Sequence, residues 1–273
     1  MEWYWHFPYK KIIMDKLCGT LFVYRGDTFD YSFKEAIQCL LEFCDHVVVA
    51  AGGDDGTLED VMDIAQKNEG KINVIVITKE EWESQSGKEK LNYFTNVAIQ
   101  YADSLGFQYN FNLQADEIVH EKSYAAIREA IQTNEESYMC TRVNLWRTPY
   151  MQLNVSQERK PCSTQVLRLG KISCRSYGDA ESLMAHTCTF DFTDRIRIYH
   201  MGFVRKQEVM RSKIINMQVD VFGMEHYDSK LDESELFNPD LWFDPKTDIK
   251  PIDEPLPKLI QDWAKERVYK NKL

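Results

Sequence analysis

The sequence predicts an α/β protein built on a single, mostly parallel β-sheet with helices on both faces. Three observations lead to this prediction. Apolar runs of strand length alternate with segments of helical period through the first half of the chain. Residues 46–51 include three consecutive valines, as strands buried on both faces do. Residues 109–113 form another apolar run, and two adjacent acids, Asp116 and Glu117, follow it.

The first elements can be taken in order. Residues 21–24 are predicted to form the first strand. Ser32 and Glu35 have the spacing of a capping box, and a helical apolar pattern follows them. After the valine-rich strand comes the glycine-rich stretch Gly52–Thr57, in which Thr57 is positioned to cap a second helix. Such a loop at a helix N-terminus can hold phosphate, although a plain tight turn fits these residues as well.

The remaining elements of the first half continue this alternation. Residues 74–77 are a predicted third strand, and 80–87 a polar loop that carries Trp82. Residues 88–105 have helical period, and 109–113 are the fourth strand. Three strand–helix repeats therefore lead into a strand with acids at its end, and the ligand site is expected along the C-terminal edge of the sheet.

The acids after the fourth strand have a possible chemical use. Asp116 lies where open α/β sheets bind ligands, and carboxylate oxygen suits Mg²⁺ or Mn²⁺. The alternative is a solvated turn that caps the helix predicted from about residue 123.

These motifs, in this order, resemble the family-2-like nucleotide-sugar glycosyltransferases of the A-type fold. That family typically has Asp-Gly-Ser-x-Asp-Gly-Thr after a strand, then a helix with Asn, then a strand ending in Asp-x-Asp. This chain has Gly52-Gly53-Asp54-Asp55-Gly56-Thr57, then Asn96, then Gln114-Ala115-Asp116-Glu117, and the similarity covers roughly residues 19–222. The resemblance implies a nucleotide-binding sheet, and the donor-binding residues expected from it and its neighbourhood are Arg25, Asp27, Asp55, Asn96, Gln114, Ala115, Asp116, Arg205 and Lys213.

Two positions depart from the family pattern. Ala51 stands where the family usually has an acid that contacts the nucleobase, so Arg25, Asp27 or Asp55 would have to contribute instead. Gln114 replaces the first Asp of Asp-x-Asp, whereas Asp116 matches the second, which is the usual direct metal ligand. The expected metal site therefore has one carboxylate fewer than the family pattern provides.

The second half is less regular. A helix is predicted over 123–133, strands over 138–146, 165–169 and 195–200, and a loop over 147–163. His120 is interpreted as the residue at which a helix begins.

The segment from His200 to Arg205 resembles the one in relatives where His completes the metal site. The resemblance thus implies a metal held by Asp116 and His200, and imidazole suits Mn²⁺ better than Mg²⁺. Arg205 and Lys213 are placed to stabilise a departing diphosphate.

Asp179 and Glu181 are the candidate catalytic residues. A carboxylate can serve as the general base that takes the proton of an acceptor hydroxyl, and these acids fall in the expected acceptor region. Ordinary surface acids are the alternative interpretation.

Composition suggests the setting of the protein. Residues 1–225 are expected to form the catalytic domain, and 226–273 a proline-rich extension that packs on this domain or on a partner subunit in a homodimer. A net charge of −10 argues against a protein that coats nucleic acid. No apolar run is long enough to span a membrane, and seven cysteines without a Cys-x-x-Cys pair suit the cytoplasm.

The sequence thus predicts a metal-dependent glycosyltransferase that moves a sugar from a nucleoside-diphosphate sugar to a hydroxyl group of a glycan or another acceptor. Two alternatives stay open. A nucleotidyltransferase would share the sheet and the metal, and a catalytically inactive sugar-nucleotide-binding protein would be consistent with Gln114 and Ala51.

Overall fold

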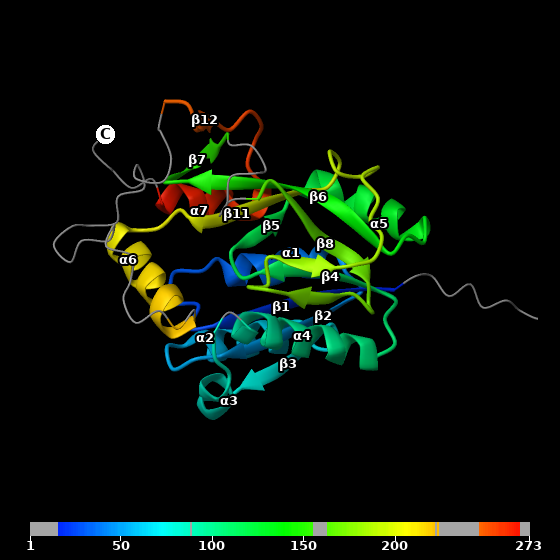
Figure 1. The fold of residues 1–273 in the computed structure, drawn as a ribbon, viewed down its shortest axis with the longest axis horizontal. Helices are drawn as coiled ribbons and strands as arrows, with labels where there is room; N and C mark the ends of the chain where they lie inside the picture. Colours follow the sequence, from blue (N-terminus) through cyan, green and yellow to red (C-terminus); the bar gives the residue numbers. More distant parts are fainter. Residues whose placement is uncertain (1–15, 88, 155–162, 222, 224–245, 268–273) are drawn as a thin grey trace, which may run out of the picture.

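The computed structural model describes residues 16–87, 89–154, 163–221, 223 and 246–267 (Figure 1). The main sheet has the strand order β12-β7-β6-β8-β4-β1-β2-β3, and β11 pairs with β5 and β6. Its strands are β1 (Leu17–Tyr24), β2 (His46–Gly52), β3 (Ile72–Ile77), β4 (Tyr109–Gln114), β5 (Glu117–Val119), β6 (Ser137–Trp146), β7 (Thr148–Leu153), β8 (Gln165–Lys171), β11 (Arg197–Phe203) and β12 (Ile249–Pro251). A separate hairpin pairs β9 (Arg175–Tyr177) with β10 (Ser182–Met184). The α-helices are α1 (Phe33–Phe43), α2 (Thr57–Lys67), α3 (Lys79–Ser84), α4 (Glu89–Ser104), α5 (Tyr124–Gln132), α6 (Gln207–Asn216) and α7 (Gln261–Glu266).

The parallel half of the sheet is confirmed. Strands β4, β1, β2 and β3 are adjacent and all run in the same direction. This follows from the sequence, because a helix separates each strand from the next and returns the chain to the same end of the sheet. The carboxyl ends of β1, β2 and β4 therefore meet at one edge.

The expectation of a mostly parallel sheet is wrong for the second half. Strand β8 is antiparallel to β4 and β6, β7 is antiparallel to β6, and β12 is antiparallel to β7. Strand β11 is parallel to β6 but antiparallel to β5, so the sheet as a whole is mixed. Only Arg147 separates β6 from β7, and its φ of 60° turns the chain back on itself. The predicted loop over 147–163 thus contains a strand, while residues 155–162 lie outside the described residues.

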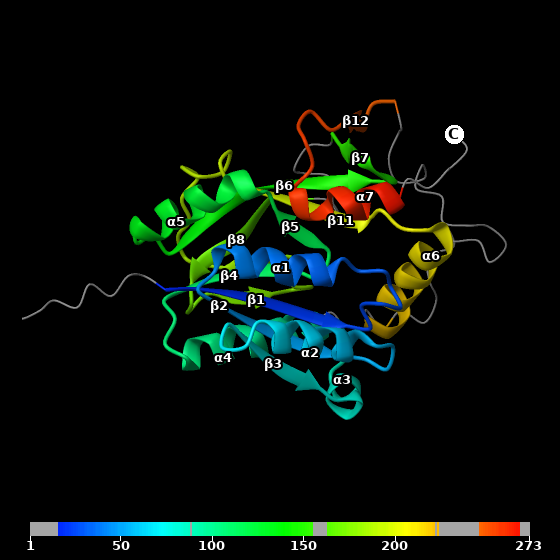
Figure 2. The same cartoon turned by 180° about the vertical axis from the view of Figure 1, so that it is seen from behind.

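Helices cover both faces of the parallel strands, as predicted. Leu21 and Val23 belong to the core beneath α1, whereas Cys18, Val48 and Ala50 belong to a second core beneath α4. Figure 1 shows α4 in front of these strands. Figure 2, seen from behind, shows α1 and α2 in front of the opposite face of the same strands. The alternation of side chains along β1 supplies both cores.

Three local expectations are corrected. Ser32 is the N-cap of α1, but its side chain makes no capping hydrogen bond. Gly56, with φ 93°, is the N-cap of α2, so Thr57 is the first helical residue instead. The predicted polar loop around Trp82 contains the helix α3, which begins with a complete capping box formed by Thr78 and Glu81. His120 is the N-cap of a 3₁₀ turn (Glu121–Ser123), in agreement with its interpretation.

The described part of the C-terminal region packs on the same chain. Ile260, Trp263 and Ala264 belong to the core that also contains α1, and α7 lies beside α1 in Figure 2. The predicted boundary between residues 225 and 226 lies outside the described residues, so the extension as a unit and the homodimer contact stay predictions. No helix in the described ranges combines the length and the apolar character needed to cross a membrane.

Candidate functional site

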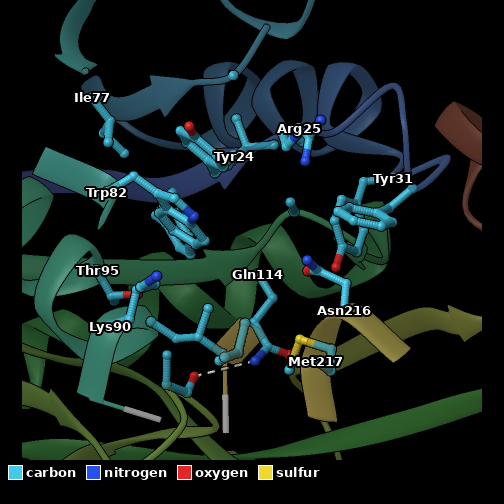
Figure 3. A pocket seen from close by; sticks show the side chains of 18 of the residues that line it. Tyr24, Arg25, Tyr31, Ile77, Trp82, Lys90, Thr95, Gln114, Asn216 and Met217 are labelled. Atoms are coloured by element: carbon cyan, nitrogen blue, oxygen red, sulfur yellow. Dashed lines mark hydrogen bonds between the residues drawn. The ribbon is translucent and has the colours of Figure 1, made fainter. Parts of the chain in front are cut away.

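A cavity of about 1000 Å³ lies at the carboxyl edge of the parallel strands. The ends of β1, β3 and β4 and the loop that follows β2 line it, together with residues of α3, α4 and α6. Side chains from these elements, including Arg25, Trp82, Gln114 and Asn216, point into a common space in Figure 3. This is the edge at which open α/β sheets bind ligands.

Asp116 is the centre of a buried charge cluster on this cavity. Its Oδ2 atom accepts hydrogen bonds from Arg205 Nη2 and Lys213 Nζ, both at 3.1 Å. Burial alone would raise the pKa of Asp116, but the adjacent cations outweigh burial and hold this pKa far below its usual range. Both cations also lie over the ring of Tyr31, at 4.8 Å and 5.0 Å from its centroid. The two cations and one carboxylate leave a net positive charge at the edge of the cavity.

His200 lines the same cavity and directs a nitrogen lone pair toward Asp116. Its Nδ1 lies 2.9 Å from Asn144 Oδ1, and the amide nitrogen of Asn144 donates to Ser163 O at 3.1 Å. The Asn144 oxygen must therefore accept from His200, so Nδ1 carries the proton and Nε2 does not. Burial drives the pKa of His200 well below its ordinary value, so the ring is neutral at pH 7.

Asp116 and His200 form a donor set that fits a divalent cation. His200 Nε2 lies 3.7 Å from Asp116 Oδ1, and two acceptor atoms that face each other favour a cation between them. The fixed tautomer of His200 is the kind of orientation that metal-ligating histidines receive from an outer hydrogen bond. Among the described residues no group of three His, Cys, Asp or Glu side chains could hold a metal.

The lack of a side chain at residue 202 leaves room for the His200 imidazole. A Cβ atom at Gly202 would lie 2.4 Å from His200 Nε2. We expect Gly202→Ala to lower the free energy of unfolding by about 1–3 kcal/mol, as overpacked sites do. Denaturant titration measures this, and the additional change His200→Ala should recover much of the loss. Equal stability of Gly202→Ala and the parent would contradict this account of the packing.

Glu117 is a buried structural acid rather than a surface ligand. Its Oε1 accepts from Arg168 Nη2 at 2.8 Å and lies 3.5 Å from Arg142 Nη1, and its Oε2 accepts from the backbone of Gln114. Arg168 also donates to the carbonyl of Ala180 at 3.0 Å, and so does the Gln114 side chain at 3.3 Å. We call Gln114, Glu117, Arg142, Arg168 and Ala180 the Glu117 clamp. The clamp holds the turn between β9 and β10 against the end of β4.

That turn carries the two candidate catalytic acids. Asp179 and Glu181 both line the cavity. Glu181 Oε1 lies 3.5 Å from Arg142 Nη2, so a cation already faces this carboxylate. Asp179 makes no ion pair or side-chain hydrogen bond with the described residues, and its carboxylate is therefore the freer of the two to accept a proton.

The cavity brings together most of the residues expected from the sequence. Those that line it are Arg25, Gln114, Ala115, Asp116, Asp179, Glu181, His200 and Lys213. Arg205 lies behind the lining and acts on the cavity through Asp116.

The other expected donor-binding residues have structural partners away from the lining. Asp55 accepts hydrogen bonds from the backbone of Thr28 and the hydroxyl of Thr57, which ties the glycine-rich loop to the β1–α1 loop. Asp27 lies 3.4 Å from Lys34 Nζ. Asn96 exchanges two hydrogen bonds with the backbone of Ser176 and so anchors β9 on α4.

Ala51 is fully buried in the core under α1 and does not line the cavity. Gly53 and Asp54 of the glycine-rich loop do line it, and Asp54 forms a 2.9 Å ion pair with Arg25.

Sequence reasoning missed several lining residues. These are Tyr24, Trp82, Lys90, Asn112 and Arg142. The Thr78-x-x-Glu81 spacing is a capping signal that could have predicted α3, and with it a fixed position for Trp82.

No protein-family model and no curated protein matches this chain. Solved structures resemble it in fold. S. aureus TarS matches over 75% of this chain and 40% of its own, at 15% identity and a TM-score of 0.41. Residues 1–349 of TarS, solved in complex with UDP, match over 74% of this chain and 66% of their own, at 13% identity and a TM-score of 0.42. This chain spans only part of the length of TarS.

Proposed function

We propose that this chain transfers a sugar from a nucleoside-diphosphate sugar to a hydroxyl group of an acceptor, such as a glycan. The observation that carries the proposal is the juxtaposition on one cavity of the Asp116–Lys213 ion pair, the neutral His200 and the carboxylate of Asp179, which has no ion-pair partner among the described residues. Cations suit a diphosphate, and a free carboxylate suits a hydroxyl that must lose its proton.

In this proposal Lys213 and Arg205 act on the leaving group. When the bond between the sugar and the diphosphate breaks, negative charge grows on the phosphate oxygen that leaves. A buried cation stabilises such charge better than a solvated one, because little water competes with it. Asp116 holds Lys213 Nζ at 3.1 Å and so fixes the cation before the reaction begins.

Asp179 acts at the other reactant. The acceptor hydroxyl gives its proton to the Asp179 carboxylate as its oxygen forms the new bond to the sugar. The Glu117 clamp keeps Asp179 at the cavity, because Arg168 and Gln114 hold the neighbouring carbonyl of Ala180.

We further propose that Mn²⁺ or Mg²⁺ binds with the donor through Asp116 and His200. When bound, the metal would neutralise charge on the phosphates as a Lewis acid. Arg205 and Lys213 occupy only the Oδ2 atom of Asp116, and Oδ1 faces His200.

A donor screen tests the proposed function. Melting of the protein is followed with a panel of nucleoside diphosphates and their sugars, each with and without Mn²⁺. A true donor at 100 times its dissociation constant should add roughly 2.7 kcal/mol of stability. Donors that stabilise the protein are then incubated with acceptor glycans, and release of the nucleoside diphosphate is measured. Release of pyrophosphate from a nucleoside triphosphate and a sugar phosphate would favour a nucleotidyltransferase, and binding without turnover would favour an inactive binding protein.

Donor affinity should depend on pH through Lys213. Burial lowers the pKa of Lys213 to about 8, even beside Asp116. Lys213 is therefore charged below pH 8 and loses its proton above it, so donor affinity should fall as pH rises past 8, by up to about tenfold per pH unit. Calorimetric titration between pH 6.5 and 9.5 measures this. Lys213→Arg keeps its charge over this range and should flatten the profile, whereas a parent profile that is already flat would contradict the role of Lys213.

A further inference from the structure

Tyr31 borders the cavity beside the two cations that surround Asp116. It lines the cavity, as Lys213 does, and its side chain is only partly buried. Figure 3 shows this side chain pointing into the cavity from the loop between β1 and α1. Arg205 Cζ lies 4.8 Å and Lys213 Nζ 5.0 Å from the centroid of its ring. Because the hydroxyl group is bonded to that ring, it is held at the same edge of the cavity as the two cations.

The hydroxyl group of Tyr31 has a proton to donate and no acceptor for it among the described residues. The Tyr31 ring contacts the two cations and meets the ring of Phe29 edge-on, but its hydroxyl makes no hydrogen bond within the described part of the chain. Burial, and after it the negative charge of Asp116, raise the pKa of this hydroxyl, so it keeps its proton at pH 7. A ligand in the cavity can therefore accept a hydrogen bond from it.

The backbone that carries Tyr31 is fixed by contacts with distant parts of the chain. The carbonyl of Phe29 accepts a hydrogen bond from Arg205 Nε at 2.7 Å. Asp30 forms an ion pair with Arg267, the residue that follows α7, and Arg267 Nε lies 3.4 Å from Asp30 Oδ2. Asp30 has a φ of 50°, a left-handed conformation that Asp adopts more readily than most residues. Tyr31 is thus positioned before a ligand binds, which lowers the entropic cost of binding.

The groups around Tyr31 suit an anion with several acceptor oxygens. The ammonium of Lys213 and the guanidinium of Arg205 only donate hydrogen bonds, and the Tyr31 hydroxyl is able to donate as well. Asp116 is the carboxylate between the two cations, so it balances only one of their two charges. Phosphate oxygens accept hydrogen bonds and carry negative charge, and a phosphate group therefore matches both the donors and the charge.

We propose that Tyr31 is a further donor-binding residue, whose hydroxyl donates a hydrogen bond to a phosphate oxygen of the nucleoside-diphosphate sugar. Its ring at the same time supports Lys213 and Arg205 through cation–π contacts. The inference rests on the proposed function, since it adds a neutral contact at the phosphates that Lys213 is proposed to hold. Tyr31 is not among the donor-binding residues that the sequence predicts.

Inorganic pyrophosphate is the probe, because it carries two linked phosphates without a base or a sugar. It is titrated calorimetrically into the parent, Tyr31→Phe and Tyr31→Leu, and the melting temperature of each protein is recorded. Tyr31→Phe removes only the hydroxyl group and should weaken binding roughly 10- to 100-fold, as the loss of one hydrogen bond to a charged group does. It should melt at the temperature of the parent, because the hydroxyl has no partner among the described residues. Tyr31→Leu also removes the aromatic ring beneath the cations and should weaken binding further.

The matched control is Tyr24→Phe. Tyr24 also lines the cavity, but its ring stacks on Trp82 at a centroid separation of 4.0 Å, so loss of its hydroxyl should leave the affinity for pyrophosphate unchanged. Parental affinity in Tyr31→Phe, or an equal loss in Tyr24→Phe, would overturn the inference and leave the proposed function intact. A parent that does not bind pyrophosphate would overturn the inference together with the phosphate site at Lys213. Pyrophosphate binding that depends on the Tyr31 hydroxyl, without sugar transfer from any donor, would support the phosphate contact and overturn the proposed function alone.

Discussion

Replacing Asp179 by asparagine is expected to lower sugar transfer about 10²- to 10⁴-fold, the usual contribution of a general base. The amide keeps the shape of the side chain but cannot take the proton of the acceptor hydroxyl. Donor affinity should be nearly unchanged, because Asp179 does not contact the Asp116–Lys213 ion pair that would hold the phosphates. Transfer is measured with saturating donor, and donor affinity by calorimetry on the same preparation.

Glu181→Gln is the informative comparison. Glu181 lies on the same turn but faces Arg142 at 3.5 Å, so its change should disturb the clamp and have a smaller effect on transfer than Asp179→Asn. Near parental transfer by Asp179→Asn would remove Asp179 as the base. Loss of donor binding in that variant would instead place this acid at the nucleotide.

Asp116→Asn should destabilise the protein by about 3–5 kcal/mol, the usual cost of removing one partner of a buried ion pair. The carboxylate is the counter-ion of both Arg205 and Lys213, and Arg205 is itself buried. Denaturant unfolding at pH 7 measures the difference in the free energy of unfolding between Asp116→Asn and the parent.

Two further variants control this measurement. Asp54→Asn breaks the exposed ion pair with Arg25 and should change the free energy of unfolding by less than about 1 kcal/mol. Asp116→Asn combined with Lys213→Met removes one of the stranded cations and should be more stable than Asp116→Asn alone. An Asp116→Asn variant as stable as the parent would mean that the two cations do not depend on this carboxylate.

The parallel half of the fold could be predicted because its signals are local. The valine run of β2 and the helical period behind Ser32 each lie within about a dozen residues. The antiparallel pairing of β6 with β7 could not, because the turn at Arg147 depends on a positive φ in a residue type that does not favour it. Helix α3 was missed because none of its residues is buried, so it shows no apolar period.

The sequence identified many residues of the candidate site, but it did not predict which of them contact each other. Asp116 was found from its place after a strand, but its partners Arg205 and Lys213 lie 89 and 97 residues away. Glu117 looked equivalent to Asp116 in the sequence, yet it begins β5 and is buried against Arg168. The alternation of side chains along the strand and partners far away in the sequence decide which of the two adjacent acids faces the cavity. A local sequence pattern cannot predict this.

The Glu117 clamp has a consequence for the order of substrate binding. It joins the turn that bears Asp179 to the strand end that bears Gln114 through hydrogen bonds to the carbonyl of Ala180. The acceptor side and the donor side of the cavity are therefore expected to move together. A donor that orders the end of β4 would also order the acceptor side, and linkage requires the effect to be reciprocal. Acceptor and donor should therefore each tighten the binding of the other by the same factor, and weakening the Arg168–Glu117 contact should bring that factor toward one.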